Sequence, residues 1–207
     1  MDACVALDVA LTSNEPGPSE APIPTSTPTR RETCRVCGTD RLLAYLNLGR
    51  QPLANALRAP GDARYELRVP LVVQTCLACK LSQLTHVVPK EILYTDYVYY
   101  SGISKAWHTH CAELADAYAR RDQFVVDIAS NDGTLLAAFR ERGCRTLGVD
   151  PAVNFATCNY PLVGAYWSST VAARDDIQGC VDVLTATNVL GHVDDVHDFM
   201  KAVCIAL

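Results

Sequence analysis

Two pairs of cysteines, each with two residues between its members, constrain the fold of this chain more than any other feature. The pairs stand in the segments CRVCG and CLACK and supply Cys34, Cys37, Cys76 and Cys79. Thiolates spaced in this way in a tight turn can point at one ion, and two such turns form a tetrahedral sulfur cage. We therefore predict a structural metal centre. Zinc is its natural occupant, although iron fits the same ligands.

A redox CxxC and an incidental spacing are the alternatives to a metal centre at the cysteine pairs. A redox CxxC should open a helix after a strand, and neither pair stands in that context. The chain has ten cysteines in all. The start of the chain lacks a secretory signal, so the remaining six are expected to be small core residues or free thiols and not a disulfide framework. They are Cys4, Cys111, Cys144, Cys158, Cys180 and Cys204.

Charge and hydropathy exclude two classes of partner. The net charge is −5 and no cluster of Lys or Arg is present, so nucleic acid is not an expected partner. No apolar run approaches the roughly 18–20 residues that a membrane-spanning helix needs. We accordingly expect a cytoplasmic protein without a membrane partner.

Composition and periodicity divide the chain into four parts. Residues 1–33 are expected to form a disordered tail, because 12–32 are rich in Pro, Ser and Thr and carry almost no large apolar side chains. Residues 34–90 contain short apolar runs and turn residues, which predict a small β-rich metal-binding lobe. Residues 91–123 comprise a tyrosine-dense loop and a linking helix. Residues 124–207 alternate strand and helix patterns, which predicts an α/β domain with a parallel, Rossmann-like sheet.

The first strand of this domain leads into a turn with a single glycine, in the segment DIASNDG. A dinucleotide site needs several glycines so that a pyrophosphate can meet a helix N-terminus. Here the turn carries Asp127 and Asp132, which would repel a pyrophosphate. Asp150 ends the second strand, where an acid can accept both ribose hydroxyls of an adenosine. Asn188 follows the fourth expected strand. Together these residues predict a site for S-adenosylmethionine, which combines an adenosine and a cationic amino-acid end and carries no phosphate. An ordinary βα turn is the alternative.

The order of these motifs resembles the sugar C-methyltransferase family. The resemblance is carried by CRVCG, LNLGRQPLAN, CLACKLSQLTHVVPKEILYTDYVYYSGIS, VVDIASNDGTLL, LGVDPAVN and TNVLGHVDDVHDF. It implies a zinc-binding lobe, a class I methyltransferase domain and C-methylation of a nucleotide-linked deoxyketosugar. It assigns the four cysteines of the pairs to zinc. It assigns S-adenosylmethionine to Asp127, Ala129, Asn131, Gly133, Asp150, Pro151 and Asn188, and the sugar to Tyr97, Tyr100 and His192.

Methylation of carbon requires a carbanion equivalent, which gives the last three residues chemical roles. His192 has the pKa range of a general base that removes the proton beside the ketone. Tyr97 or Tyr100 could hydrogen-bond the developing enolate oxygen. The alternatives are that His192 caps the helix that follows it and that the tyrosines serve packing.

The chain departs from the family in its length. It stops at Leu207, after the fourth expected strand and its helix, whereas the family's sheet and a further domain continue. We therefore expect an incomplete methyltransferase domain whose uncovered sheet edge promotes self-association. Two further functions stay open: a catalytically inactive, zinc-bearing binding or scaffold remnant, and a zinc-bearing adaptor on a nicotinamide-binding fold.

Overall fold

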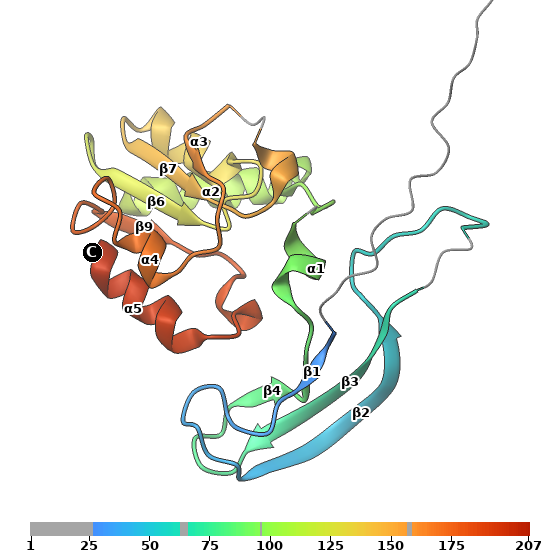
Figure 1. Cartoon of the computed structure of the whole chain (residues 1–207). Coiled ribbons are helices and arrows are strands. Elements are labelled where there is room, and N and C mark those ends of the chain that lie inside the picture. Colours follow the sequence, from blue (N-terminus) through green and yellow to red (C-terminus); the bar gives the residue numbers. More distant parts are fainter. Residues whose placement is uncertain (1–26, 63–65, 96, 157–158) are drawn as a thin grey trace, which may run out of the picture.

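The computed structural model describes residues 27–62, 66–95, 97–156 and 159–207, which form a β-rich lobe and an α/β domain (Figure 1). The mixed α/β fold expected from the sequence is confirmed. Most of the expected tail, residues 1–26, lies outside the described residues, as does Cys158. Within the described part, no helix has the length and apolar character needed to cross a membrane.

The lobe consists of antiparallel strands. Its three-stranded sheet has the order β2-β3-β4, and a second small sheet pairs β1 with β5. The strands are β1 (Thr29–Arg30), β2 (Leu42–Pro52), β3 (Arg68–Cys76), β4 (Ser82–Leu84) and β5 (His86–Val87). Because β1 pairs with β5, ordered structure begins before Cys34, within the segment that the sequence assigned to the tail.

Three helical segments connect the lobe to the α/β domain. They are α1 (Lys90–Tyr94), the 3₁₀ turn η1 (Ser101–Ile103) and α2 (Lys105–Tyr118). The tyrosine-dense segment therefore begins with a short helix, where the sequence predicted only a loop. Ser104 caps α2, since its side chain accepts a hydrogen bond from the backbone N–H of Trp107. The buried side of α2 carries Cys111 and Ala115.

The α/β domain contains a parallel sheet of four strands in the order β8-β7-β6-β9. The strands are β6 (Phe124–Ile128), β7 (Arg145–Val149), β8 (Leu162–Val163) and β9 (Val183–Thr185). The helical elements are α3 (Thr134–Glu141), η2 (Val153–Phe155), α4 (Ser169–Ala172), η3 (Leu190–His192) and α5 (Val196–Ala206). Parallel strands joined by helices are the arrangement that the alternating pattern predicted.

Two apolar clusters cover the two faces of this sheet. Val125 points toward α2 and α3, where it packs with Leu135 and Phe139. Val126, the next residue, points to the opposite face and packs with Ala172 of α4 and Ala202 of α5. Successive side chains of a strand alternate between faces, so a strand buried on both sides needs consecutive apolar residues. The sandwiched sheet brings the carboxyl ends of β6, β7 and β9 to one edge.

Candidate functional site: a cysteine cage and a cavity at the sheet edge

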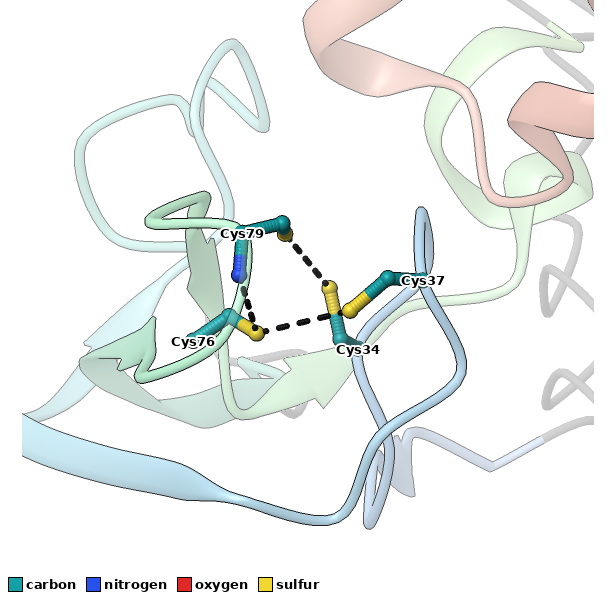
Figure 2. A group of neighbouring side chains, drawn as sticks. All are labelled: Cys34, Cys37, Cys76 and Cys79. Carbon is teal, nitrogen blue, oxygen red and sulfur yellow. Dashed lines mark hydrogen bonds between the residues drawn. The ribbon is translucent and has the colours of Figure 1, made fainter.

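The two cysteine pairs form matching turns at the end of the lobe. In the first turn, the backbone N–H of Gly38 donates to the carbonyl of Cys34 at 2.9 Å. In the second, the N–H of Lys80 donates to the carbonyl of Cys76, also at 2.9 Å. The same local backbone geometry thus presents both pairs of thiols to a common centre (Figure 2).

The spacing of the four sulfur atoms fits a tetrahedral metal ion. All four Sγ atoms lie within 4.8 Å of one another. The Cys34 and Cys79 sulfurs are 3.5 Å apart, and those of Cys37 and Cys76 are 3.6 Å apart. Zn–S bonds of about 2.3 Å in a tetrahedron place the sulfurs about 3.8 Å from one another. A small outward adjustment would therefore accommodate zinc, and the four thiols leave no open ligand position.

Backbone donors favour the thiolate at Cys76, whereas at Cys79 the backbone hydrogen bond to Leu81 lowers the pKa but burial and the three neighbouring thiols raise it to about 12. Burial acts to raise the pKa of the Cys76 thiol, but hydrogen bonds from the backbone N–H groups of Cys79 and Ala78 and from neighbouring thiols lower it to about 6. The Cys79 N–H reaches the Cys76 sulfur at 3.4 Å. Metal ligation requires the deprotonated sulfur, so a donor set that favours the thiolate suits a metal site.

The second candidate site is a cavity of about 890 Å³ at the carboxyl edge of the parallel sheet. The α/β domain, α1 and the residues after β5 and β9 all line it. Eight predicted site residues lie in its wall: Tyr97, Asp127, Ala129, Asn131, Asp150, Pro151, Asn188 and His192. Two predicted residues, Tyr100 and Gly133, are not part of the wall.

The turn after β6 adopts left-handed backbone conformations without a run of glycines. Its φ angles are +55° at Ala129, +52° at Asn131 and +79° at Gly133. The amide side chain of Asn131 compensates, because its Oδ1 accepts from the backbone N–H of Ser101 and its Nδ2 donates to the carbonyl of Tyr99. Loop residues 99–101 thus secure a turn that exposes backbone to the cavity.

Gly133, which the sequence predicts at the cofactor site, permits close packing in this turn. A Cβ added there would lie 2.4 Å from the ring of Tyr160. The residue stands at the N-cap position of α3, where its left-handed conformation ends the turn. Its absence of a side chain therefore lets the turn close against Tyr160.

Two buried carboxyl groups lie under the turn. Asp127 is 4% exposed and accepts a hydrogen bond of 2.7 Å from the hydroxyl of Thr185. Burial raises the pKa of Asp127 to about 7, and the nearby carboxylate of Asp150 adds to this rise. Asp150 is 5% exposed, and burial raises its pKa as well.

The two oxygens of Asp150 each hold one backbone donor. Oδ2 accepts from the N–H of Asn131 at 2.9 Å, and Oδ1 accepts from the N–H of Ala152 at 2.8 Å. A carboxylate oxygen accepts two hydrogen bonds, so one acceptor position remains on each. Asp150 could therefore accept two further hydroxyl donors, as a ribose diol requires.

The tyrosine-dense segment supplies a ring that contacts His192. The ring of Tyr94, at the end of α1, lies 6.2 Å from the His192 ring and 5.8 Å from the Tyr97 ring, measured between centroids. Tyr100 instead packs edge-on against Phe155 at 5.2 Å. Sequence reasoning missed Tyr94, although it stands in the same tyrosine-dense stretch.

The structure also excludes the alternative that His192 caps the helix that follows it. The N-cap of α5 is Asp195, whose side chain accepts from the backbone N–H groups of His197 and Asp198. His192 belongs to η3, before this helix, and its side chain is exposed at the cavity. It is therefore available to a ligand there.

The residues after β8 contribute two aromatic side chains that no sequence motif marked. Tyr166 and Trp167 line the cavity, and the Lys90 ammonium lies 4.3 Å from the centroid of the Tyr166 ring. The indole Nε1 of Trp167 is buried and has no hydrogen-bond partner among the described residues. A buried donor without a partner is unfavourable. The same side chain packs against the apolar cluster that covers one face of the sheet.

Comparison with known proteins bears on the cysteine cage and on the chain as a whole. Residues 34–94 match the family described as "Putative zinc binding domain". Over 187 residues the chain is 30% identical to the C-methyltransferase NovU of Streptomyces niveus. The chain is homologous to a C-methyltransferase. The alignment covers 85% of the chain and 44% of NovU, so the chain spans less than half the length of this relative.

The resemblance predicted from the motifs is thus confirmed. The zinc-binding match begins at the first cysteine of the cluster, Cys34, and extends through α1 to Tyr94. It therefore includes a helix that lines the cavity, beyond the lobe boundary at residue 90 that the composition predicted.

Proposed function

We propose that the chain serves S-adenosylmethionine-dependent C-methylation of a nucleotide-linked deoxyketosugar. The observation that carries the proposal is one cavity whose wall contains both Asp150, with its two free acceptor positions, and the pair Tyr97 and His192. A group that binds ribose and groups suited to enolate chemistry would then face the same space. The homology to a C-methyltransferase supports the same reaction class.

The residues around the β6 turn would hold the cofactor. Asp150 would accept the ribose hydroxyls, and the left-handed turn at Ala129 and Asn131 would let the ligand approach the backbone closely. Asp127 would face the cationic amino-acid end. When bound, S-adenosylmethionine supplies an electrophilic methyl group on a sulfonium.

The remaining residues of the wall would handle the proton and the developing charge. His192 would remove the proton from the carbon beside the ketone, and the Tyr97 hydroxyl would donate a hydrogen bond to the enolate oxygen. We place Tyr97 at this oxygen in preference to Tyr100, because Tyr100 lies outside the cavity wall. The nearby ring of Tyr94 would pack against His192 and restrict its orientation.

Calorimetry with S-adenosylmethionine tests the cofactor half of the proposal. The parent chain should bind the cofactor, and Asp150→Ala should weaken binding about ten- to a hundred-fold through loss of charge-assisted hydrogen bonds. Asp176→Ala is the matched control, since Asp176 pairs with Arg174 on an exposed surface. Equal affinity of parent and Asp150→Ala would contradict the site. No binding by the parent would favour a zinc-bearing scaffold instead.

Proton exchange tests the enolate half without requiring complete turnover. In heavy water, the hydrogen beside the ketone of a nucleotide-linked deoxyketosugar should exchange for deuterium in the presence of the protein, as followed by NMR. His192→Ala should lose at least about a hundred-fold in this rate, in the range of general-base catalysis. The variant should keep its affinity for S-adenosylmethionine. Undiminished exchange by His192→Ala would exclude it as the base.

A further inference from the structure

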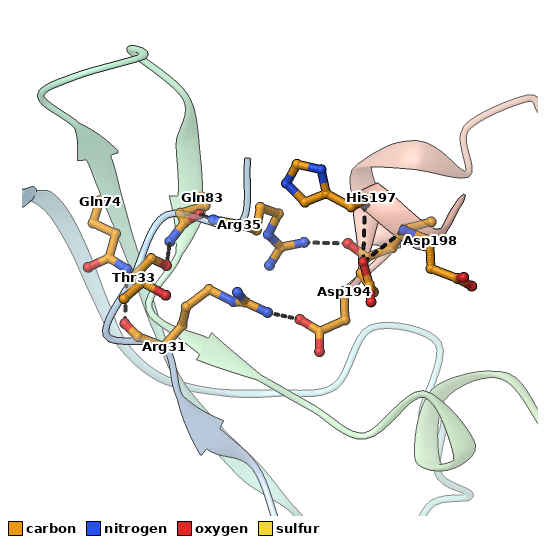
Figure 3. A network of polar contacts seen from close by, with 10 residues as sticks. Arg31, Thr33, Arg35, Gln74, Gln83, Asp194, His197 and Asp198 are labelled. Carbon is orange, nitrogen blue, oxygen red and sulfur yellow. Dashed lines mark hydrogen bonds and ion pairs between the residues drawn. The ribbon is translucent and has the colours of Figure 1, made fainter. Parts of the chain in front are cut away.

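The first cysteine turn contacts the segment that carries His192, although the two are far apart in sequence (Figure 3). Arg31 forms an ion pair with Asp194. The Nη1 atom of Arg35 donates to the carbonyl of Val193 at 2.7 Å. Beyond them, the Nε2 atom of His197 lies 2.8 Å from the carbonyl of Val36. Three polar contacts therefore connect the lobe to the residues just after His192.

The segment 187–194 has few other constraints. Its own backbone bonds are local: His192 N–H donates to Val189, and Val193 N–H donates to Leu190. Across the described parts of the chain, the hydrogen bonds that join 187–194 to the remainder come from Arg31 and Arg35. Short local bonds do not fix where a loop lies relative to a sheet. Apart from the ring contact between Tyr94 and His192, the contacts that position this loop therefore come from these two side chains.

The backbone at both arginines is itself held within the lobe by buried amides. Gln83 accepts from the N–H of Arg35 at 3.0 Å and donates to the carbonyl of Thr33 at 3.0 Å. Gln74 donates to the carbonyl of Arg31. Both glutamines are 6% exposed and stand on strands β4 and β3. Both arginine side chains thus extend from backbone that hydrogen bonds hold in place within the lobe.

The charges at this contact are complementary. Both arginines are cations, and the Asp194 carboxylate of the loop faces them, forming an ion pair with Arg31. The carboxylate supplied by the loop therefore stabilises two neighbouring cations of the lobe, while the lobe supplies the loop with its external hydrogen bonds.

We propose that Arg31 and Arg35 are positioning residues that hold the segment 187–194, with Asn188 and His192, against the cavity. Because Arg35 lies between Cys34 and Cys37, the cysteine turn would be part of the architecture of the site as well as a support for the lobe. This proposal concerns position, and it stands whether or not His192 acts as a base.

Amide hydrogen exchange of the full, zinc-loaded chain, followed by mass spectrometry, tests this proposal without cofactor or substrate. Arg35→Ala should accelerate exchange in residues 187–194 about fivefold or more, in line with loss of a charge-assisted hydrogen bond. Zinc content and exchange in β6 and β7 should not change. Arg30→Ala is the matched control, because Arg30 pairs with Glu32 on an exposed surface and does not contact the loop. Unchanged exchange in 187–194 would overturn the proposal.

A second variant approaches the contact from the loop, in case Arg35→Ala disturbs the lobe itself. Asp194→Ala removes the partner of Arg31 but leaves the cysteine turns and both glutamines intact. It should accelerate exchange in 187–194 and shift the NMR signal of the His192 imidazole Cε1–H, with exchange in β2 and β3 unaltered. Arg35→Lys keeps a donor and the charge. Compared with Arg35→Ala, it should therefore retain most of the protection of residues 187–194 against amide exchange. Parent-like exchange and an unmoved imidazole signal in Asp194→Ala would overturn the proposal.

Discussion

Asp127 is a carboxyl group that the fold buries almost completely, with one hydroxyl donor from Thr185. Burial disfavours the charged form, which is why its pKa rises from 3.8 to about 7. The position of an acid at the end of a strand was predictable from the sequence. Its altered protonation depends chiefly on how completely the fold buries it, which the sequence alone does not reveal.

This raised pKa predicts an unusual pH dependence of stability. Between pH 4 and 7 the folded state binds a proton at Asp127 that the unfolded state has released, so the free energy of unfolding falls as pH rises through this window. Asp127→Asn removes this effect and keeps an acceptor for Thr185. The melting temperature of the variant, relative to that of the parent, should therefore increase as the pH rises from 5 to 8.

The control for this measurement is Asp176→Asn. Asp176 is exposed, and its hydrogen bond from Arg174 lowers its pKa, so its substitution should give no such gain at high pH. If the melting temperatures of the parent and of Asp127→Asn change with pH in the same way across this range, the pKa of Asp127 is not raised.

At the element scale, the glycine of the βα turn after β6 permits close packing. Gly133 and Gly179 both have positive φ, but only Gly133 has a neighbour in the way, the ring of Tyr160. Gly179→Ala should cost about 1–2 kcal/mol from backbone strain alone. Gly133→Ala should cost about 1–3 kcal/mol more from overpacking. Urea denaturation of the two variants measures the difference, and equal losses would contradict a steric role for Gly133.

The cysteine turns are the second element with a direct test. Purified protein should contain about one zinc ion per chain, and Cys76→Ser should release it and loosen residues 34–90, because structural zinc contributes folding free energy. Cys180→Ser is the control, since Cys180 is an exposed thiol outside the cluster. Metal analysis and proteolysis provide the readouts. Full zinc content in Cys76→Ser would exclude this residue as a ligand.

At the scale of the whole molecule, β9 is an edge strand of the described sheet, with β6 as its neighbour. An unpaired edge presents backbone donors and acceptors that another chain can use. We expect residues 1–207 to self-associate, with a sedimentation coefficient that rises with protein concentration. A monomer across the accessible concentration range would contradict this expectation.

A variant of the lobe distinguishes this edge from a second candidate surface. Leu43, on the outer strand β2 of the lobe, is 54% exposed and could also mediate contact between copies. Leu43→Lys leaves β9 unchanged and should therefore leave the association intact. Loss of association in Leu43→Lys would move the contact from β9 to the lobe.

The amino-acid sequence by itself determined the local features of this protein. The CxxC spacing requires turns that converge on one centre, and consecutive apolar residues at 125–126 require a strand covered on both faces. Alternation of strands and helices then requires a parallel sheet with its ligand edge at Asp127 and Asp150. Each of these was predicted from residue type, spacing and hydrophobic pattern along the chain.

The tertiary structure alone decided which distant side chains share the cavity. It placed Tyr94 beside His192, turned Tyr100 toward Phe155, and brought Trp167 into the wall. It also placed Arg35 of the first cysteine turn on the carbonyl of Val193. Such contacts depend on how the lobe packs against the α/β domain. Residue type and spacing along one segment carry no information about that packing, because the partner of each side chain lies on another element.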